Sequence, residues 1–379
     1  MTSVLEDQPS QVRIRDLQVD EADVVGKFFH EHWRPNHIFF RNRELLFWQY
    51  RNNPYASLFT DGLTFRAAME KGDLIGVFGY MPFVFNRYGT RQYGCNLSAW
   101  WVHPNHRRGS LGLSLLHSLQ QDSPFDACIA GINTPTAEKI YLRMSWVVVP
   151  CIPRLVFIAD REAFADLVEP GKSIPATTMP SVETKTGASI EVSRLPSFDS
   201  LVKLDWDSFY WQKIAPSQMG PAREVSYLRW RYEQIPLFQY DALVATDRQG
   251  VAGLLVYRIE RVQGRQEIVI RLVDLIAKPP AVSALLRSLI QLARERHAAL
   301  IDFFCTYSPY LDQLRESGFV DASESSGERY WCPFLFQPLD HARNRLNTSW
   351  WIRNVDLTSQ PARADFCIMK GDYEFDRPN

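Results

Sequence analysis

One pattern of aromatic residues and proline occurs twice in the chain, once in each half. The segment Trp48–Pro54 reads WQYRNNP and the segment Trp230–Pro236 reads WRYEQIP, so tryptophan, tyrosine and proline keep the same spacing. A strand-like apolar run follows each segment, with Gly76 in the first and Gly253 in the second. A chain of 379 residues is also too long for one ordinary core. The repeat therefore predicts two related domains in tandem, with the repeated aromatic residues in their cores.

The stretch between the two copies has the composition of a connector. Glu169–Ser193 is rich in proline, threonine, serine and lysine and shows no apolar periodicity. We place the domain boundary near Ser181. This gives an N-terminal domain of residues 1–181 and a C-terminal domain of residues 182–379.

The order of elements in the first half follows from periodicity. Val12–Leu17 alternates like a strand, Glu21–Trp33 has helical spacing with an acidic first turn, and Asn36–Asn53 contains a second helix. Three strand-like runs separated by glycine turns follow and end at Val102. We expect an α+β fold in which each domain is a mostly antiparallel, twisted mixed sheet flanked by helices.

The most informative stretch is Cys95–Gln121. Cys95–Val102 is an apolar run rich in aromatic residues, His103–Ser110 is polar and basic, and Leu111–Gln121 has leucines at helical spacing. This pattern predicts a buried strand, a loop and a helix. The unpaired N–H groups and the positive dipole at a helix N-terminus favour an anion there.

Cations and small residues in the loop strengthen the prediction of an anion site. Arg107 and Arg108 would attract phosphate, while Gly109 and Gly112 would let the backbone approach it closely. The expected ligand is a pyrophosphate group. A basic turn before an amphipathic helix is the alternative interpretation.

A second motif follows the next expected strand, Ala127–Gly131. Asn133 comes directly after this strand, and Thr134 and Pro135 suit the cap and the first turn of a helix that carries Tyr141. The pattern again predicts a strand, a short polar loop and a helix.

These motifs resemble the acyl-CoA-binding signatures of the GNAT superfamily of N-acetyltransferases. The family's loop reads Gln/Arg-x-x-Gly-x-Gly/Ala, which falls on Arg107, Ser110 and Gly112, and its second signature is an asparagine before a helix with a tyrosine. Here Ser110 replaces the first glycine, and Gly109 stands one place earlier. The resemblance implies two tandem GNAT-like domains. It also implies that acyl-CoA contacts residues of the strand, the loop and the second motif, namely Trp100, Trp101, Val102, Arg107, Arg108, Gly109, Ser110, Leu111, Gly112 and Asn133.

The resemblance also implies a chemistry. An amine attacks the acyl thioester directly while both are bound, and a backbone N–H within Leu97–Trp101 polarises the carbonyl. Tyr141 matches the tyrosine that protonates the departing thiolate in many members; a tyrosine packed on the apolar face of its helix is the alternative. His103 is a candidate base at neutral pH, although a lone histidine before proline is more often simply solvated.

The second copy departs from the first at the loop. Lys278–Val282 contains neither glycine nor arginine, and Pro279 and Pro280 lack the backbone N–H groups that a phosphate needs. We expect the second domain not to bind coenzyme but to form half of an acceptor cleft at the domain interface. A structural role, in which it covers an edge of the first sheet, is the alternative.

The chain ends with alternating acidic residues. On a short strand, Asp372, Glu374 and Asp376 would share one face and could receive an ammonium group. A solvated acidic tail is the alternative. This end resembles that of tandem-domain GNAT proteins that N-acylate nucleotide-linked amino sugars for bacterial surface polysaccharides.

Composition narrows the choice of partners. The formal net charge of −1 gives no reason to expect nucleic acid. No apolar run approaches the roughly 20 residues that span a bilayer, and the first residues lack the plan of a signal peptide. The cysteines are scattered, with no metal-ligand spacing. We expect a cytoplasmic protein with no metal site.

Together these features predict an acyl-CoA-dependent N-acyltransferase. It would move an acetyl or another short acyl group from acetyl-CoA or a related thioester to the amine of a nucleotide-linked amino sugar, as a monomer or a homodimer. Two alternatives stay open. One is a Fem-type aminoacyl or mycothiol-synthase-like transferase, which also has tandem GNAT domains, and the other is a non-catalytic CoA-binding or scaffolding module.

Overall fold

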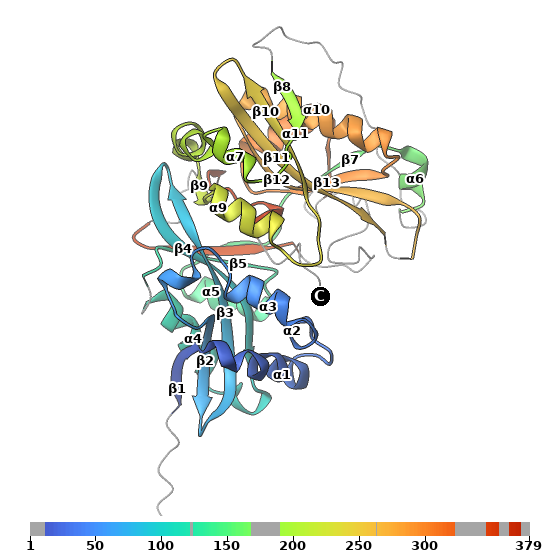
Figure 1. Cartoon of the computed structure of the whole chain (residues 1–379). Helices are drawn as coiled ribbons and strands as arrows, with labels where there is room; N and C mark the ends of the chain where they lie inside the picture. The colour runs from blue at the N-terminus through green and yellow to red at the C-terminus, as the bar shows by residue number, and fades with distance from the viewer. Residues whose placement is uncertain are drawn as a thin grey trace, which may run out of the picture.

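The two halves of the chain form two lobes, each built on a sheet. The computed structural model describes residues 12–121, 124–167, 190–262, 264–322, 346–355 and 364–372. In Figure 1 the first half makes the lower lobe and the second half the upper lobe. Two mostly antiparallel twisted sheets with flanking helices confirm the predicted α+β fold. No helix in these ranges is both long and apolar enough to cross a bilayer.

The first sheet has the order β1-β2-β3-β4-β5-β15-β6, and β9 pairs with the far end of β3. Within the described residues every pair is antiparallel except β4 with β5, which is parallel. The strands are β1 (Arg13–Leu17), β2 (Leu63–Glu70), β3 (Asp73–Arg87), β4 (Thr90–Val102), β5 (Ala127–Gly131), β6 (Val147–Val149), β9 (Met219–Pro221) and β15 (Thr348–Ile352).

The second sheet repeats this plan in the order β14-β7-β13-β12-β11-β10-β8. Its described parallel pair is β12 with β13, the counterpart of β4 with β5. The strands are β7 (Arg154–Ile158), β8 (Glu191–Arg194), β10 (Asp241–Asp247), β11 (Gly250–Arg261), β12 (Ile268–Ala277), β13 (Leu300–Phe304) and β14 (Val320–Asp321).

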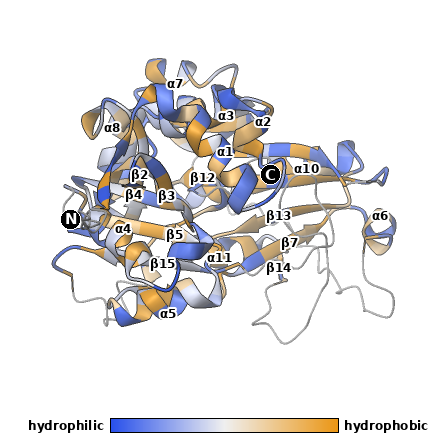
Figure 2. Cartoon of the chain, turned by 90° about the horizontal axis from the view of Figure 1, so that it is seen from below, coloured by the Kyte–Doolittle hydropathy of each residue, from blue (hydrophilic) through white to orange (hydrophobic). Residues whose placement is uncertain are grey.

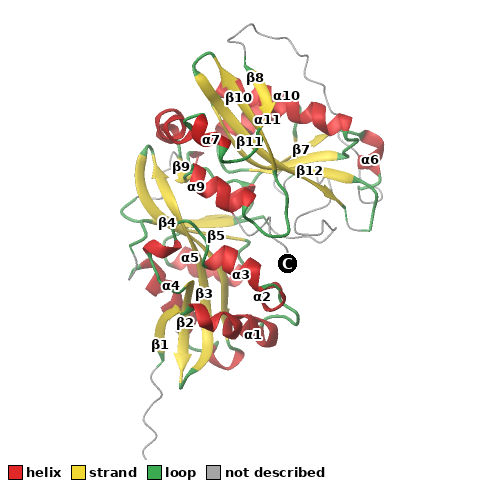
Figure 3. Ribbon diagram, viewed as in Figure 1, coloured by secondary structure: helices red, strands yellow, loops and turns green. Residues whose placement is uncertain are grey.

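Helices lie against the faces of both sheets (Figure 3). Figure 2 shows mainly apolar residues on strands such as β5 and β13, whereas α5 and α10 alternate between polar and apolar residues. This contrast is expected where buried strands are covered by amphipathic helices. The helices are α1 (Ala22–His32), α2 (Ile38–Arg41), α3 (Arg43–Tyr50), α4 (Leu111–Gln120), α5 (Pro135–Arg143), α6 (Arg161–Ala165), α7 (Ser200–Lys203), α8 (Trp206–Phe209), α9 (Val225–Leu228), α10 (Pro279–Glu295) and α11 (Ser308–Glu316).

The two sheets exchange a strand. β7 precedes the expected boundary in the sequence but pairs with β13 in the second sheet. β15 comes near the end of the chain but lies between β5 and β6 in the first sheet. Ser181 itself lies outside the described residues, so the position of the boundary stays a prediction. Each sheet is thus completed by a strand from the other half of the chain.

The segment Asn36–Asn53 contains two helices where one was predicted. α2 ends at Arg41, and Asn42 has extended backbone angles and separates it from α3. The Asn42 side chain accepts a hydrogen bond from the N–H of Leu45 at 2.9 Å. A polar residue of this kind caps a new helix more readily than it continues an old one.

Two tryptophans of the repeated segments meet between the lobes. The rings of Trp48 on α3 and Trp230 in the helical turn Arg229–Glu233 stack with centroids 4.8 Å apart. Nε1 of Trp48 donates to the carbonyl oxygen of Trp230 at 2.8 Å, and Nε1 of Trp230 donates to that of Trp48 at 2.9 Å. Both side chains are buried, which confirms that they are core residues. The reciprocal bonds indicate a two-fold relation between the repeats.

The repeated tyrosines also occupy matching positions. The hydroxyl of Tyr50 shares a hydrogen bond of 2.8 Å with Oγ of Ser98 on β4, and Tyr232 donates to Oδ2 of Asp274 on β12 at 2.6 Å. Ser98 and Asp274 are equivalent because each pairs with the third residue after the repeated glycine of the preceding strand. The duplication therefore extends from the sequence pattern to single hydrogen bonds.

The tryptophan pair leads to a test of stability. Replacing either ring by phenylalanine removes an indole N–H and leaves a buried carbonyl without its donor, so Trp48→Phe and Trp230→Phe should each lower the free energy of unfolding by about 1–3 kcal/mol. Chemical denaturation measures the loss, with the exposed Leu237→Ala as a control. An effect in only one of the two tryptophan variants would contradict the reciprocal arrangement.

Candidate active site

The first sheet opens into a fork between β4 and β5. Their pairing ends where Leu97 lies opposite Ala130, although β4 continues to Val102. Ala99 has a φ of 49°, in the left-handed region, and the register of β4 against β3 shifts beside it. Such a bulge bends a strand and leaves backbone groups without a ladder partner. The fork is therefore a place where a ligand can meet the backbone of β4.

A cleft of about 330 Å³ occupies this fork. On one face Trp100 stacks on Phe78, with ring centroids 4.8 Å apart. On the other face Trp101 stacks on Trp33 at 5.2 Å. The two neighbouring tryptophans point to opposite faces, as strand alternation requires. The cleft is thus lined by side chains from the α5 side and from the α1 side of the sheet.

The predicted loop and helix follow β4 directly. His103 begins the loop and its Nδ1 accepts from the N–H of Asn105 at 3.2 Å, and α4 begins at Leu111 as predicted. A Cβ on Gly112 would lie 3.4 Å from the ring of Trp100. The first turn of α4 therefore packs directly on the aromatic wall of the cleft.

The basic residues of the loop lie on the surface, near the cleft. Nε of Arg107 donates to the carbonyl oxygen of Val102 at 3.0 Å, and its guanidinium lies 4.5 Å from the ring centre of Trp101. Arg108, Gly109 and Ser110 are exposed. Arg107 thus fixes the loop against the end of β4, while the exposed part of the loop remains open to a ligand.

Two of the predicted residues have a packing role. The side chains of Leu111 and Val102 each lie 3.6 Å from the position that a Cβ on Gly76 would take. They hold the first turn of α4 against β3, and Gly76 allows that close approach.

Asn133 is fixed by a residue near the end of the chain. Its N–H donates to Oδ1 of Asn347 at 2.6 Å, and Nδ2 of Asn347 donates back to its carbonyl oxygen at 2.9 Å. Nδ2 of Asn347 also donates to Glu138 on α5 at 2.8 Å. Asn133 lines the cleft, so the strand exchange that brings β15 beside β5 also holds this wall in place.

Tyr141 lies on α5 and lines the same cleft. Its side chain is only 2% exposed, and its ring stacks on Trp146 with centroids 4.4 Å apart. Burial raises the pKa of the Tyr141 phenol far above its ordinary value, and the nearby Cys128 and Cys95 thiols raise it further. The phenol therefore keeps its proton at neutral pH and can act only as a donor or a neutral acceptor.

The structure does not bring His103 to the residues that line the cleft. Its ring lies 4.4 Å from that of His32 and 5.7 Å from that of His106. Burial lowers the pKa of His103, and His32, His106 and Arg107 lower it further. It is a neutral loop residue near neutral pH, next to Arg107.

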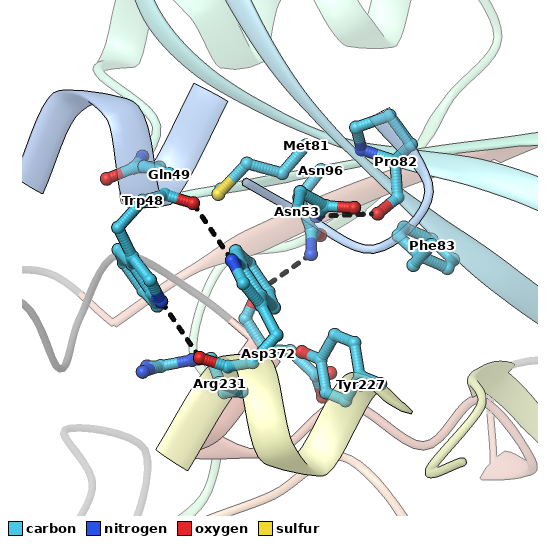
Figure 4. Close-up of a pocket in the computed structure, with 11 residues that line it drawn as sticks. Trp48, Gln49, Asn53, Met81, Pro82, Phe83, Asn96, Tyr227, Arg231 and Asp372 are labelled. Carbon is cyan, nitrogen blue, oxygen red and sulfur yellow. Dashed lines mark hydrogen bonds between the residues drawn. The ribbon is translucent and has the colours of Figure 1, made fainter. Parts of the chain in front are cut away.

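A second, smaller cavity lies between the lobes and shares Met81 and Asn96 with the cleft. Figure 4 shows Nδ2 of Asn96 donating to the backbone carbonyl oxygen of Asp372. Trp48 and Tyr227 form the aromatic side of the cavity. The cavity encloses about 20 Å³, enough for roughly one water molecule. A group that enters from the cleft therefore meets a small aromatic space with a polar floor.

Asp372 lies on that floor, but not in a strand. Residues Lys370–Asp372 form a helical turn, because the N–H of Asp372 bonds to the carbonyl oxygen of Met369 at 3.0 Å and Oδ2 caps the N–H of Met369 at 2.8 Å. The prediction of alternating acidic residues on a strand is wrong at this position. Glu374 and Asp376 lie outside the described residues.

The environment of Asp372 is buried and charged. Its side chain is 3% exposed and Oδ2 also accepts from Arg223 at 2.8 Å, while Oδ1 has no partner among the described residues. Burial raises the pKa of Asp372 to about 6, against the lowering effect of Arg223, and Asp274 adds to the rise. Asp372 can therefore exchange a proton near neutral pH.

Sequence reasoning missed four residues that build these sites: Asn96, Arg223, Asp274 and Asn347. Asn96 and Asp274 stand out within apolar strands, and a polar residue in a fully buried run is itself a signal of a partner. Arg223 and Asn347 lie in loops, and no local pattern distinguishes them.

Comparison with solved structures identifies the fold, although no protein-family model and no curated protein matches the chain. A GCN5-related N-acetyltransferase from Anabaena variabilis ATCC 29413 has a TM-score of 0.57 and 12% identity, covering 90% of this chain and 73% of that chain. A conserved protein of unknown function from Enterococcus faecalis V583, called a "Probable N-Acyltransferase", has a TM-score of 0.55 and 10% identity, covering 90% and 72%. A GCN5-related N-acetyltransferase from Kribbella flavida has a TM-score of 0.50 and 15% identity, covering 77% and 64%. The chain thus has the fold of the GCN5-related N-acetyltransferases, or GNAT fold, in a tandem arrangement.

Proposed function

We propose that the protein is an acyl-CoA-dependent N-acyltransferase that works by direct attack in a ternary complex. The observation that carries the proposal is the cleft through the β4–β5 fork. Side chains on both faces of the sheet line it: Trp100 in its wall packs against the first turn of α4, and Asn96 also lines the smaller cavity beside Asp372. A donor and an acceptor would therefore meet at the same point of β4 from opposite faces of the sheet.

The coenzyme side of the cleft fits an acyl-CoA. The first N–H groups of α4, together with Arg107 and Arg108, would hold the pyrophosphate. Asn133 would accept from an amide of the pantetheine arm through its side-chain oxygen, because its backbone N–H and carbonyl oxygen are bonded to Asn347. Trp100 would wall the apolar part of this path, because it lies against Gly112.

Three groups would act on the reacting atoms. Backbone N–H groups of β4 within Leu97–Trp101 would polarise the thioester carbonyl, in the region where the ladder to β5 has ended. Tyr141 would donate its proton as charge builds on the departing sulfur. Asp372 would accept a proton from the acceptor's ammonium group, so that a neutral amine attacks.

For the acceptor we propose the amine of a nucleotide-linked amino sugar. This rests on the resemblance of the chain's end and of its tandem organisation. The cavity beside Asp372 has room for an amine or a small substituent and no more. The sugar and the nucleotide would therefore lie along the open α1 side of the cleft, between Trp33 and the second lobe.

The coenzyme site can be tested by adding a charge at the first turn of α4. Gly112→Glu places a carboxylate where the pyrophosphate is expected, so its affinity for acetyl-CoA in a calorimetric titration should fall by roughly tenfold or more. Gly112→Ala is the matched control, because its methyl group would only touch the Trp100 ring. Wild-type protein that binds no acetyl-CoA would overturn the proposed function.

The proposed role of Tyr141 predicts that removing its hydroxyl lowers kcat without changing the KM for acetyl-CoA. Tyr141→Phe keeps the stack on Trp146 but removes the proton, so kcat should fall on the order of 100-fold with little change in the KM for acetyl-CoA. Thiol release from acetyl-CoA with a panel of nucleoside-diphosphate amino sugars measures the rate. The exposed Tyr88→Phe serves as a control. An unchanged kcat would reduce Tyr141 to a packing residue.

A further inference from the structure

The second sheet has a fork at the position where the first sheet has its cleft. β12 and β13 pair from Val269 opposite Leu300 to Arg271 opposite Asp302, and β12 then continues to Ala277 paired with β11 but not with β13. In the repeat, this point corresponds to the β4–β5 fork. By duplication alone, a second coenzyme cleft would open here.

The fork is filled by the chain's own segment 366–372, which we call the C-terminal plug. The N–H of Leu275 on β12 donates to the thioether sulfur of Met369 at 3.4 Å, and Met369 is fully buried. Beyond β13, the N–H of Thr306 bonds to the carbonyl oxygen of Ile368 at 3.0 Å, and the N–H of Ile368 bonds to Oγ1 of Thr306 at 2.9 Å. The plug thus satisfies the N–H of Leu275 on β12 and the N–H of Thr306 beyond β13 with its own atoms.

The plug ends at the cavity between the lobes. Nζ of Lys370 bonds to Oδ1 of Asp302 on β13 at 2.6 Å, and Nε of Arg231 donates to the carbonyl oxygen of Gly371 at 2.8 Å. A Cβ on residue 371 would lie 1.8 Å from the hydroxyl of Tyr232, so glycine is required for this approach. The backbone that carries Asp372 is therefore fixed on both sides.

One arginine then holds two carboxylates. Arg223 bonds to Asp274 through Nε at 2.8 Å and Nη2 at 3.0 Å, and the same Nη2 bonds to Oδ2 of Asp372 at 2.8 Å. All three side chains are buried. Tyr232 completes the far side by donating to Asp274. Within the described residues Oδ1 of Asp372 has no partner, and Asp372 also lines the cavity that shares Asn96 with the cleft.

We propose that the second domain has exchanged a coenzyme cleft for the C-terminal plug, and that Arg223 and Asp274 are positioning residues that hold Asp372 ready to receive the acceptor's amine. This inference rests on the proposed function, which it deepens by assigning a task to the second domain. Asp274 is the counterpart of Ser98, so the same position of the repeat serves the cleft in one domain and the base in the other.

The charges around Asp372 predict in which direction each substitution shifts the pKa of its carboxyl group. The titratable and charged groups near it are Arg223, Asp274, Tyr227, Cys367 and Arg231, while Tyr232 bonds to Asp274 and Lys370 to Asp302. Asp274→Asn removes a negative charge that raises the pKa of Asp372 and leaves Arg223 to one carboxylate. Arg223→Lys keeps the positive charge but loses the planar fork that reaches both carboxylates. The first change should lower the pKa of Asp372 and the second should raise it.

The experiment follows the protonation of Asp372 by infrared difference spectroscopy of the full-length protein between pH 4 and pH 8, the approximate span in which a carboxyl of raised pKa titrates. Wild-type protein should show a buried carboxyl that titrates at about pH 6 and is absent in Asp372→Asn. Asp274→Asn should move this titration down by roughly one pH unit, and Arg223→Lys should move it up. A carboxyl titration near pH 6 that persists in Asp372→Asn, or shifts of the same sign in both other variants, would overturn the proposal.

The infrared measurement needs neither coenzyme nor acceptor, so it tests the positioning of Asp372 separately from the proposed transferase function. A correct infrared result with no acetyl-CoA binding would overturn the proposed function and leave the geometry of the carboxyl pair standing. Where transfer is measured, the low-pH limb of kcat/KM should shift in the same direction as the infrared titration in each variant. A purely structural role for Arg223 and Asp274 would move stability without moving this limb in opposite directions.

Discussion

The parallel pairing of β4 with β5 stops at Leu97, and the candidate site depends on that interruption. In a continuous ladder the N–H groups of the following residues would be satisfied within the sheet and closed to a ligand. The bulge at Ala99 bends β4 beyond this point, and strand alternation then places Trp100 and Trp101 on opposite faces. The end of the ladder thus combines a cleft in the sheet, an aromatic wall on each face, and backbone donors between them.

The same interruption in the second sheet shows how duplication can produce two different parts from one plan. Its β12–β13 fork is closed by Met369, whose sulfur accepts from the N–H of Leu275. Prolines begin α10, so the helix N-terminus next to this fork also lacks donors. A fork that holds no ligand must be filled by the protein's own atoms, because an empty fork would leave polar backbone buried and unpaired. The C-terminal plug fills the β12–β13 fork, and the same segment carries Asp372 toward the first domain.

The local elements and the repeat could be predicted from the sequence, because both are encoded in short-range patterns of residues. The strand, loop and helix from Cys95 to Gln121 and the cap at Thr134 are set by neighbouring residues, and the structure confirms them. The strand exchange and the plug depend on contacts between residues far apart in the sequence, from Ile368 with Thr306, 62 positions apart, to Asn133 with Asn347, 214 positions apart. The residue pattern of a single segment does not predict such a contact. The structure places Asp372 beside the cavity between the lobes, but in a helical turn and not in the predicted strand, because its own carboxylate caps that turn.

The buried Arg223 with its two carboxylates is difficult to explain by stability alone. Desolvation of three charged groups costs several kcal/mol per ion, and apolar side chains of similar size are often at least as stable. Two carboxylates on one guanidinium also leave a net negative charge inside the protein, which favours a proton on one of them. The same feature that makes this cluster a poor structural brace makes Asp372 a group whose proton can leave and return near neutral pH. Its place beside Asn96, at the meeting of the cleft and the interdomain cavity, is where an incoming amine would need such a group.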